Sequence, residues 1–144
     1  SDSFFADSRL NAVDDILAKA EKMLNEGAEI LDIGAYSSRP GAEDISESKE
    51  SEKIEMAVSA IIEKYPEAII SIDTFRSNVA ESGIMAGASM INDISGGVRD
   101  ARIFKVAATY KTPIVLMHMR GTPQNMQDNC NYKVLTNEVI YFLQ

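Results

Sequence analysis

Cysteine and long apolar runs are nearly absent from the sequence. Cys130 is the only cysteine in 144 residues, so no intrachain disulfide is possible, which fits a reducing compartment. No apolar run approaches the ~18 residues of a membrane span. No basic stretch followed by an apolar one marks a signal peptide near Ser1. We therefore expect a cytoplasmic protein without a membrane anchor.

Positive charge is also scarce. The chain has 14 Lys and Arg residues against 22 Asp and Glu residues, which gives a net charge of −8 at pH 7. Because nucleic-acid affinity comes mainly from neutralising phosphates, a chain this acidic is a poor nucleic-acid binder. An anionic membrane surface is disfavoured for the same reason. An anionic small molecule stays open as a ligand, provided that a local cation binds it.

What is present is the composition of one ordinary folded domain over residues 1–144. Hydrophobic residues make up 45% and charged residues 25%, and we find no linker, repeat or low-complexity tract. Thr74 is the expected N-cap of a helix, and Gly27 and Gly87 are expected helix stops. Periodicity predicts helices at about 10–24, 54–65, 74–85, 100–110 and 132–142, and short apolar strands at 28–33, 68–72, 89–94 and 113–117.

Helices that alternate with apolar strands predict an α/β fold with a parallel sheet covered on both faces. A doubly wound open sheet and part of a (β/α)₈ barrel both fit this order. A full barrel needs ~250 residues, so a barrel here would be partial. We expect the chain to begin in a loop before its first helix, with a strand missing ahead of it, and both ends look cut.

Polar side chains follow the expected strands at the edge where both architectures bind ligands. Asp32 and Asp73 follow the first two strands, Asn92 and Asp93 end the third, and His118 follows the fourth. Structural alternatives exist, such as an Asx turn at Asp32 or a helix cap at Asp73. Four such strand ends on one edge nevertheless indicate a binding site.

The third strand narrows the class of ligand. Side chains alternate along a strand, so one of Asn92 and Asp93 must point inward and the other outward. An inward Asn offers both donors and an acceptor, and Asp73 can accept two N–H groups. These groups suit a fused, amino-substituted ring such as a pterin or a purine.

A second polar segment, Ser37-Ser38-Arg39-Pro40-Gly41, combines hydroxyls with a guanidinium and suits a phosphate or carboxylate. A solvated loop is the alternative. Arg39, with Arg120 near the fourth strand, is the candidate local cation. The only histidine, His118, is open to a structural or an acid–base role. No metal-ligand cluster, P-loop or nucleophile elbow is present in the sequence.

Five stretches, in order along the chain, resemble dihydropteroate synthase, the folate-pathway enzyme family that sulfonamide drugs inhibit. They are Asp2-Ser3-Phe4, Asp32-Ile33-Gly34 with Ser38-Arg39-Pro40-Gly41-Ala42, Ser71-Ile72-Asp73-Thr74, Ala86-Gly87-Ala88 with Ile91-Asn92-Asp93, and Met117-His118-Met119-Arg120-Gly121 with Pro123 and Met126. The resemblance implies a (β/α)₈ TIM barrel, of which this chain would hold about strands 2–5 with their flanking helices.

The resemblance also implies an activity, that of a transferase. The family condenses 6-hydroxymethyl-7,8-dihydropterin diphosphate with p-aminobenzoate to give 7,8-dihydropteroate, with Mg²⁺ assisting the departure of pyrophosphate. Asp73 and Asp7 would be catalytic, and Asp73 with Asn92 would hold the pterin edge. Loss of pyrophosphate leaves a cationic methylene on the ring, which an anionic Asp73 would stabilise.

The remaining pocket residues are assigned by the same motifs. Ser38 would contact the diphosphate-bearing substrate. Arg39 and Pro40 would shape the p-aminobenzoate side, where sulfonamides compete. Ile94 and Met117 would be apolar walls of the pocket.

The sequence also departs from the family pattern. Tyr36 stands where the family usually has Glu, and Ser38 where it has Thr. The family's metal-binding Asn would lie before Ser1, so no metal ligand is expected in this chain. The family's later pterin-contacting Asp and Lys, and its Arg-x-His anion site, would lie beyond Gln144. We therefore expect the chain alone to be catalytically incomplete and the full-length protein to be a homodimer.

Two other functions stay open. One is the pterin-binding domain of a corrinoid-dependent methyltetrahydrofolate methyltransferase, which shares the barrel and the pterin-holding Asp and Asn. The other is a non-catalytic pterin-binding homologue. The segment from Ser38 to Gly41 favours the synthase, because it suits p-aminobenzoate and a diphosphate.

Overall fold

The computed structural model describes residues 2–36, 45–122, 125, 128 and 130–144, with side chains from residue 11 onward. Helices and strands alternate along the chain, as predicted. The elements are α1 (Asp2–Asn25), β1 (Ile30–Ile33), α2 (Glu47–Lys64), β2 (Ile69–Asp73), α3 (Ser77–Met85), β3 (Met90–Asp93), α4 (Arg102–Tyr110), β4 (Ile114–Leu116) and α5 (Leu135–Leu143).

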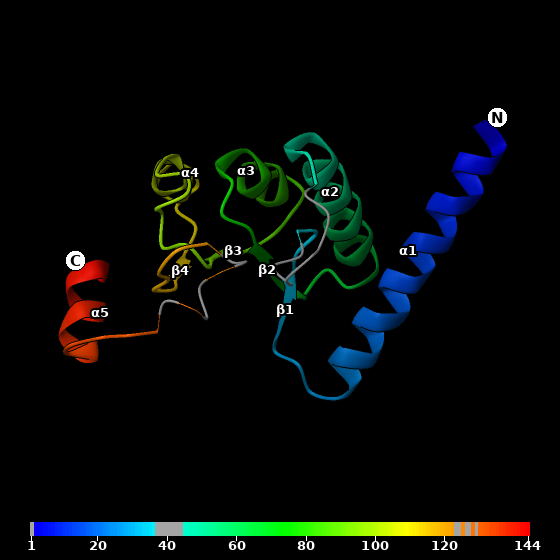
Figure 1. The fold of residues 1–144 in the computed structure, drawn as a ribbon. Coiled ribbons are helices and arrows are strands. Elements are labelled where there is room, and N and C mark those ends of the chain that lie inside the picture. The colour runs from blue at the N-terminus through cyan, green and yellow to red at the C-terminus, as the bar shows by residue number, and fades with distance from the viewer. Residues whose placement is uncertain (1, 37–44, 123–124, 126–127, 129) are drawn as a thin grey trace.

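The four strands form one parallel sheet in the order β1-β2-β3-β4 (Figure 1). Each crossover helix returns the chain to the next neighbouring strand. A doubly wound sheet reverses its strand order at a switch point, and the described sheet has no such reversal. Its sequential order is that of the wall of a (β/α)₈ barrel.

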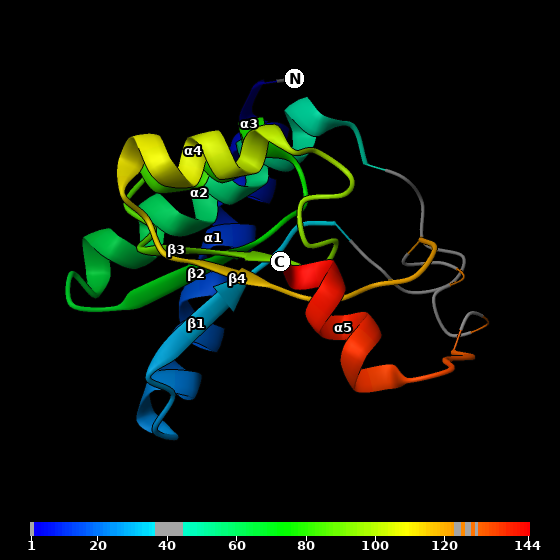
Figure 2. The ribbon, with the colours of Figure 1, turned by 90° about the vertical axis from the view of Figure 1, so that its left-hand side faces the viewer.

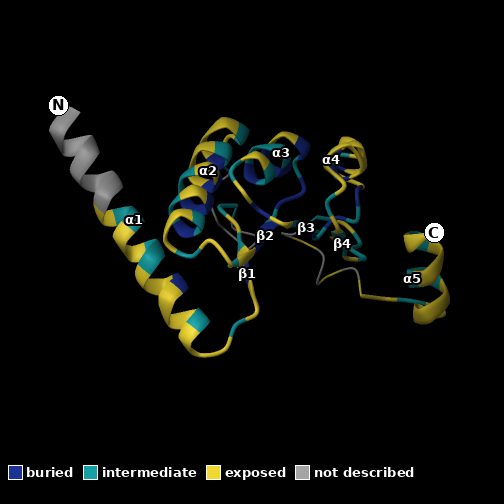
Figure 3. Cartoon of the chain, turned by 180° about the vertical axis from the view of Figure 1, so that it is seen from behind, coloured by how far each residue is buried: buried dark blue, intermediate teal, exposed yellow. Residues whose placement is uncertain are grey.

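Helices α2, α3 and α4 lie side by side over one face of the sheet (Figures 1 and 2). The main core lies between them and the sheet, where the buried sides of α2 and α3 face the strands (Figure 3). Its fully buried members include Ile54, Val58, Ile70, Ile72 and Val79. The apolar strand centres therefore form the core on this face.

The opposite face of the sheet is open, so the prediction of cover on both faces is wrong for the described residues. Ile30, Ile69 and Val115 project from that face and are 47%, 46% and 45% exposed. The reason is that α2, α3 and α4 all pack on the same side. In a barrel this open face is the interior.

The first helix begins earlier than predicted. Residues 2–9, expected as a loop, are part of α1. They contain no Gly or Pro that would stop a helix. At the other end, Gly27 has a φ of +96° and terminates the helix as predicted.

Thr74 does not cap α3, contrary to the prediction. The helix begins at Ser77, and the Oδ2 of Asp100 accepts hydrogen bonds from the N and Oγ of Ser77 at 3.0 and 2.6 Å. The hydroxyl of Thr74 is engaged elsewhere, because it donates to Glu50 at 2.9 Å. Asp100, in the loop between β3 and α4, thus supplies the cap of α3.

The later helices also start after the predicted positions, at Arg102 and Leu135. On α4, Ile103 and Ala107 are buried, whereas Phe104 is 42% exposed and its ring lies against the loop glycine Gly97. In the described part of the chain, no helix is both long and apolar enough to cross a membrane.

Candidate functional site

Three polar side chains from neighbouring strands meet on the open face of the sheet, at its carboxyl edge. They are Asp32 on β1, Asp73 on β2 and Asn92 on β3. Asp73 is paired with Asn92 in register, and Asp32 is paired with Ser71, two residues before Asp73, so all three share one face. The Nδ2 of Asn92 donates to the Oδ2 of Asp32 at 3.0 Å. The strand ends therefore converge as the sequence predicts.

Asn92 and Asp93 point to opposite sides of the sheet. Asp93 faces the helices and is fully buried, where its carboxylate accepts from the N and Oγ of Ser95 at 2.8 Å and from the N of Gly97 at 2.7 Å. These bonds fix the turn after β3. Asn92 is the member of the pair that faces the open side.

The pKa of the Asp73 carboxyl group is higher than that of an ordinary aspartate. Partial burial is the main cause, and the neighbouring carboxylates of Asp32, Glu50 and Asp93 add repulsion, so that its pKa rises to about 6. At neutral pH the group is mostly ionised, yet it gains or loses a proton within the physiological range. Such a carboxylate can accept N–H donors from a ring and can oppose a positive charge that develops nearby.

Gly34 provides the space that Asp73 occupies. A Cβ atom at Gly34 would lie 3.2 Å from the Cβ, the carbonyl oxygen and the Oδ2 of Asp73. The glycine follows Asp32 by two residues. Gly34 belongs to one of the motifs found in the sequence, but no role was predicted for it. Its position beside two strand-end carboxylates was the signal that could have indicated one.

Glu50 lies in the acidic first turn of α2, yet its side chain is withdrawn from solvent. It is only 1% exposed, because it shares the inner face of α2 with Ile54, Ala57 and Ile61. Its position four residues before Ile54 was the sequence signal that Glu50 lies on the buried face of the helix. Its two oxygens accept from Thr74 and Arg76 at 2.9 and 2.5 Å.

The other predicted site residues are placed less fully. Ile94 is half-buried directly after β3, and Met117 follows β4, is 45% exposed and donates its N–H to the Asp93 carbonyl at 3.0 Å. Asp7 lies within α1, and its side chain is not described. Ser38, Arg39 and Pro40 lie outside the described residues. Of the predicted site residues, the structure thus brings Asp32, Asp73 and Asn92 together.

Arg120 and His118 belong to a separate cluster around α5. Arg120 forms an ion pair with Glu138, donates to the Asn131 carbonyl at 2.6 Å, and lies 4.2 Å from the ring centre of Tyr132. His118 packs edge-on against Phe142 at 4.7 Å. These contacts fasten the segment that leads into α5. Arg120, a candidate anion-binding cation, is therefore engaged in structural contacts.

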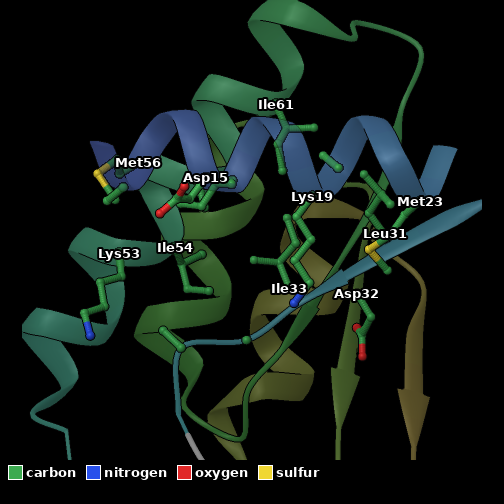
Figure 4. Close-up of a pocket in the computed structure, with 16 residues that line it drawn as sticks. Asp15, Lys19, Met23, Leu31, Asp32, Ile33, Lys53, Ile54, Met56 and Ile61 are labelled. Carbon is green, nitrogen blue, oxygen red and sulfur yellow. The ribbon is translucent and has the colours of Figure 1, made fainter. Parts of the chain in front are cut away.

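A pocket lies elsewhere in the described part of the chain, between α1, α2 and β1 (Figure 4). It measures about 580 Å³ and is lined mainly by aliphatic side chains, with Asp15, Lys19 and Lys53 among them. Asp32 is at its edge, whereas neither Asp73 nor Asn92 lines it. We therefore base the site on the polar cluster, where hydrogen-bonding groups converge, and not on this crevice between helices.

No group of three or more His, Cys, Asp or Glu residues suited to a metal ion occurs within the described residues. Two carboxylates and an amide on the open face of a barrel wall are the donors and acceptors expected in a protein that binds a polar, nitrogen-rich ring. The comparisons agree with that class. The chain belongs to the pterin binding enzyme family, whose model matches residues 1–144.

Relatives and solved structures extend this finding. A dihydropteroate synthase from Synechocystis is 42% identical over 141 residues, which are 98% of this chain and 48% of that protein. The structure of dihydropteroate synthase from Yersinia pestis with a sulfonamide drug has a TM-score of 0.82 and 35% identity, and the match covers 92% of this chain and 47% of that one.

A third comparison concerns a protein with a bound pterin. The structure of dihydropteroate synthase from Anaplasma phagocytophilum with 6-hydroxymethylpterin-monophosphate has a TM-score of 0.82 and 29% identity, covering 91% of this chain and 53% of that one. The chain thus spans about half the length of the dihydropteroate synthases it matches.

Proposed function

We propose that the intact encoded protein is a dihydropteroate synthase. It condenses 6-hydroxymethyl-7,8-dihydropterin diphosphate with p-aminobenzoate, and the products are 7,8-dihydropteroate and pyrophosphate. The proposal rests on one observation above all. Asp73 and Asn92 are paired in register on the open face of a pterin-family sheet, with Asp32 hydrogen-bonded to Asn92. The relatives named dihydropteroate synthase support this choice of reaction.

In this mechanism Asp73 and Asn92 bind the pterin edge. Asn92 uses one N–H for Asp32, and its amide oxygen and second N–H are then oriented toward the ring. The bond between the methylene carbon and the diphosphate oxygen breaks, and pyrophosphate leaves with the electron pair. The ionised form of Asp73 stabilises the cation that results. The p-aminobenzoate amine then forms the C–N bond and loses a proton, a step that needs positioning more than activation.

The remaining roles follow the family resemblance. Ser38 contacts the diphosphate substrate, and Arg39 and Pro40 shape the p-aminobenzoate side, where sulfonamides compete. Asp7 assists catalysis, and Ile94 and Met117 form apolar walls. Mg²⁺, when bound, would supply positive charge to the leaving pyrophosphate. Because the described residues hold no group suited to a metal, none of the steps above is routed through the ion. The intact protein is proposed to be a cytoplasmic homodimer, which sedimentation analysis and cell fractionation can test.

Turnover by the intact protein tests the proposal. With both substrates and Mg²⁺, we expect dihydropteroate and pyrophosphate in equal amounts, and near-complete loss of both products with Asp73→Asn. Binding of methyltetrahydrofolate without release of pyrophosphate would favour the corrinoid-dependent methyltransferase. Pterin binding without any turnover would favour the non-catalytic homologue. Wild-type kinetics in the Asp73→Asn protein would contradict the role given to this residue.

A further inference from the structure

A buried network behind the polar cluster centres on Glu50 and Arg76. The side chains of these residues are 1% and 19% exposed, and the Nη1 of Arg76 lies 2.5 Å from the Oε2 of Glu50. The other Glu50 oxygen accepts the Thr74 hydroxyl at 2.9 Å. An ion pair withdrawn from water is stable only when its remaining hydrogen bonds are satisfied. Glu50 therefore holds the Arg76 guanidinium in a defined direction.

The guanidinium of Arg76 also contacts two residues that are distant from it in sequence. Its Nη1 donates to the carbonyl of Ile45 at 2.9 Å, and its Cζ lies 5.4 Å from the ring centre of Tyr36. The Tyr36 ring meets Phe75 edge-on at 5.1 Å. Cation–π and edge-to-face contacts of this kind are favourable over these distances. Arg76 thus joins the end of β2 to both Tyr36 and Ile45.

Tyr36 and Ile45 are the residues on either side of segment 37–44, which lies outside the described residues and contains Ser38, Arg39 and Pro40. The same network also reaches the pterin side of the site. Thr74 directly follows Asp73, accepts from the Arg76 N–H at 3.2 Å, and donates its own N–H to the Asn92 carbonyl at 3.1 Å. One buried group of contacts therefore links both flanks of the segment to the backbone of both pterin-binding residues.

We propose that Arg76, oriented by Glu50, is a positioning residue that fixes the two flanks of segment 37–44 relative to the carboxyl end of β2. The inference rests on the proposed function, because the segment contains the residues given to p-aminobenzoate and β2 ends in the residue given to the pterin. Arg76 touches neither substrate. It sets the distance between the two halves of the reaction, on which bond formation depends.

Tyr36 gives this proposal a further physical basis. Its aromatic ring attracts the guanidinium of Arg76 without placing a second carboxylate beside Glu50.

The test uses the intact protein and compares two measurements, the KM for p-aminobenzoate during turnover and the Kd for the pterin diphosphate by calorimetry. Arg76→Lys keeps the charge but loses the fork that reaches Glu50, Ile45 and Tyr36 together. We expect its KM to rise about tenfold, with the Kd for the pterin diphosphate within about twofold of wild type. Arg102→Lys, the same change at an exposed arginine on α4, should leave both values unchanged.

A second pair of variants keeps the proposal testable if Arg76→Lys does not fold. Tyr36→Leu removes the ring and should raise the KM, whereas Tyr36→Phe keeps the ring and should raise the KM less. An unchanged KM in both Arg76→Lys and Tyr36→Leu would overturn the proposal. Equal weakening of KM and Kd would overturn it too, because that result indicates a general structural role. Failure of the wild-type protein to turn over would instead refute the proposed function.

Discussion

Replacing Asp73 by asparagine should stabilise the folded protein above pH 6 while it weakens pterin binding. Folding raises the pKa of this carboxyl group from 3.8 to about 6, chiefly by partial burial and then by repulsion from Asp32. Between these two pH values the folded state binds more protons than the unfolded state. The stabilisation is therefore fully present below pH 3.8 and is lost as the pH rises through about 6.

The size of the effect follows from the two pKa values. A single carboxyl with a pKa of 3.8 unfolded and about 6 folded makes the wild-type protein lose about 1.4 kcal/mol between pH 5 and pH 8. Because Asp73 is only partly buried, solvent screening reduces this to about 1 kcal/mol. The asparagine variant lacks the ionisable group and should not show this part of the loss.

Urea unfolding followed by circular dichroism at pH 5 and pH 8 measures the difference. The free energy of unfolding of Asp73→Asn minus that of wild type should be larger at pH 8 than at pH 5, by about 1 kcal/mol. Asp14→Asn, the same change at an exposed position on α1, is the control and should show no such dependence. An identical difference at both pH values for Asp73→Asn would refute the reasoning.

Three further perturbations test neighbouring parts of the site and fold. Asp32→Asn removes a carboxylate that raises the pKa of Asp73, so a carboxyl ¹³C titration should place that pKa lower than in wild type; an unchanged value would contradict the electrostatic argument. Gly34→Ala places a methyl 3.2 Å from the Cβ, carbonyl oxygen and Oδ2 of Asp73, and calorimetry should show pterin affinity reduced roughly tenfold, with a stability cost of about 1–3 kcal/mol. Asp100→Ala removes the cap of α3 and should cost about 1–2 kcal/mol in urea unfolding, whereas a cost near zero would mean that water replaces the cap.

The alternation of helices and strands could be predicted because local pattern alone determines it. Gly27 and Gly87, both at positive φ, end their helices where the sequence places them. The strand-end polar residues could be predicted as a cluster because parallel strands bring their carboxyl ends to one edge. Only the structure shows that Asn92, and not Asp93, points inward. The alternation of side chains along a strand requires the two to point in opposite directions but does not determine which one faces in.

The errors came from contacts between distant parts of the chain. Threonine is a residue type that often caps helices, but the hydroxyl of Thr74 donates a hydrogen bond to Glu50, which lies 24 residues earlier. Glu50 stands in an acidic stretch, and only the structure shows that it is buried and bonded to Thr74 and Arg76. Arg120 was a candidate cation, yet Glu138 on α5 neutralises it. Local sequence pattern contains no information about such pairings.

The central claim is that Asp73 and Asn92 together bind the pterin edge. Calorimetric titration of the intact protein with 6-hydroxymethyl-7,8-dihydropterin diphosphate tests it most directly, with Asp73→Asn, Asn92→Ala and an Asn78→Ala control on the exposed side of α3. Each site variant should bind roughly 10- to 100-fold more weakly than wild type, and the control should bind equally well. Wild-type affinity in both site variants would contradict the account.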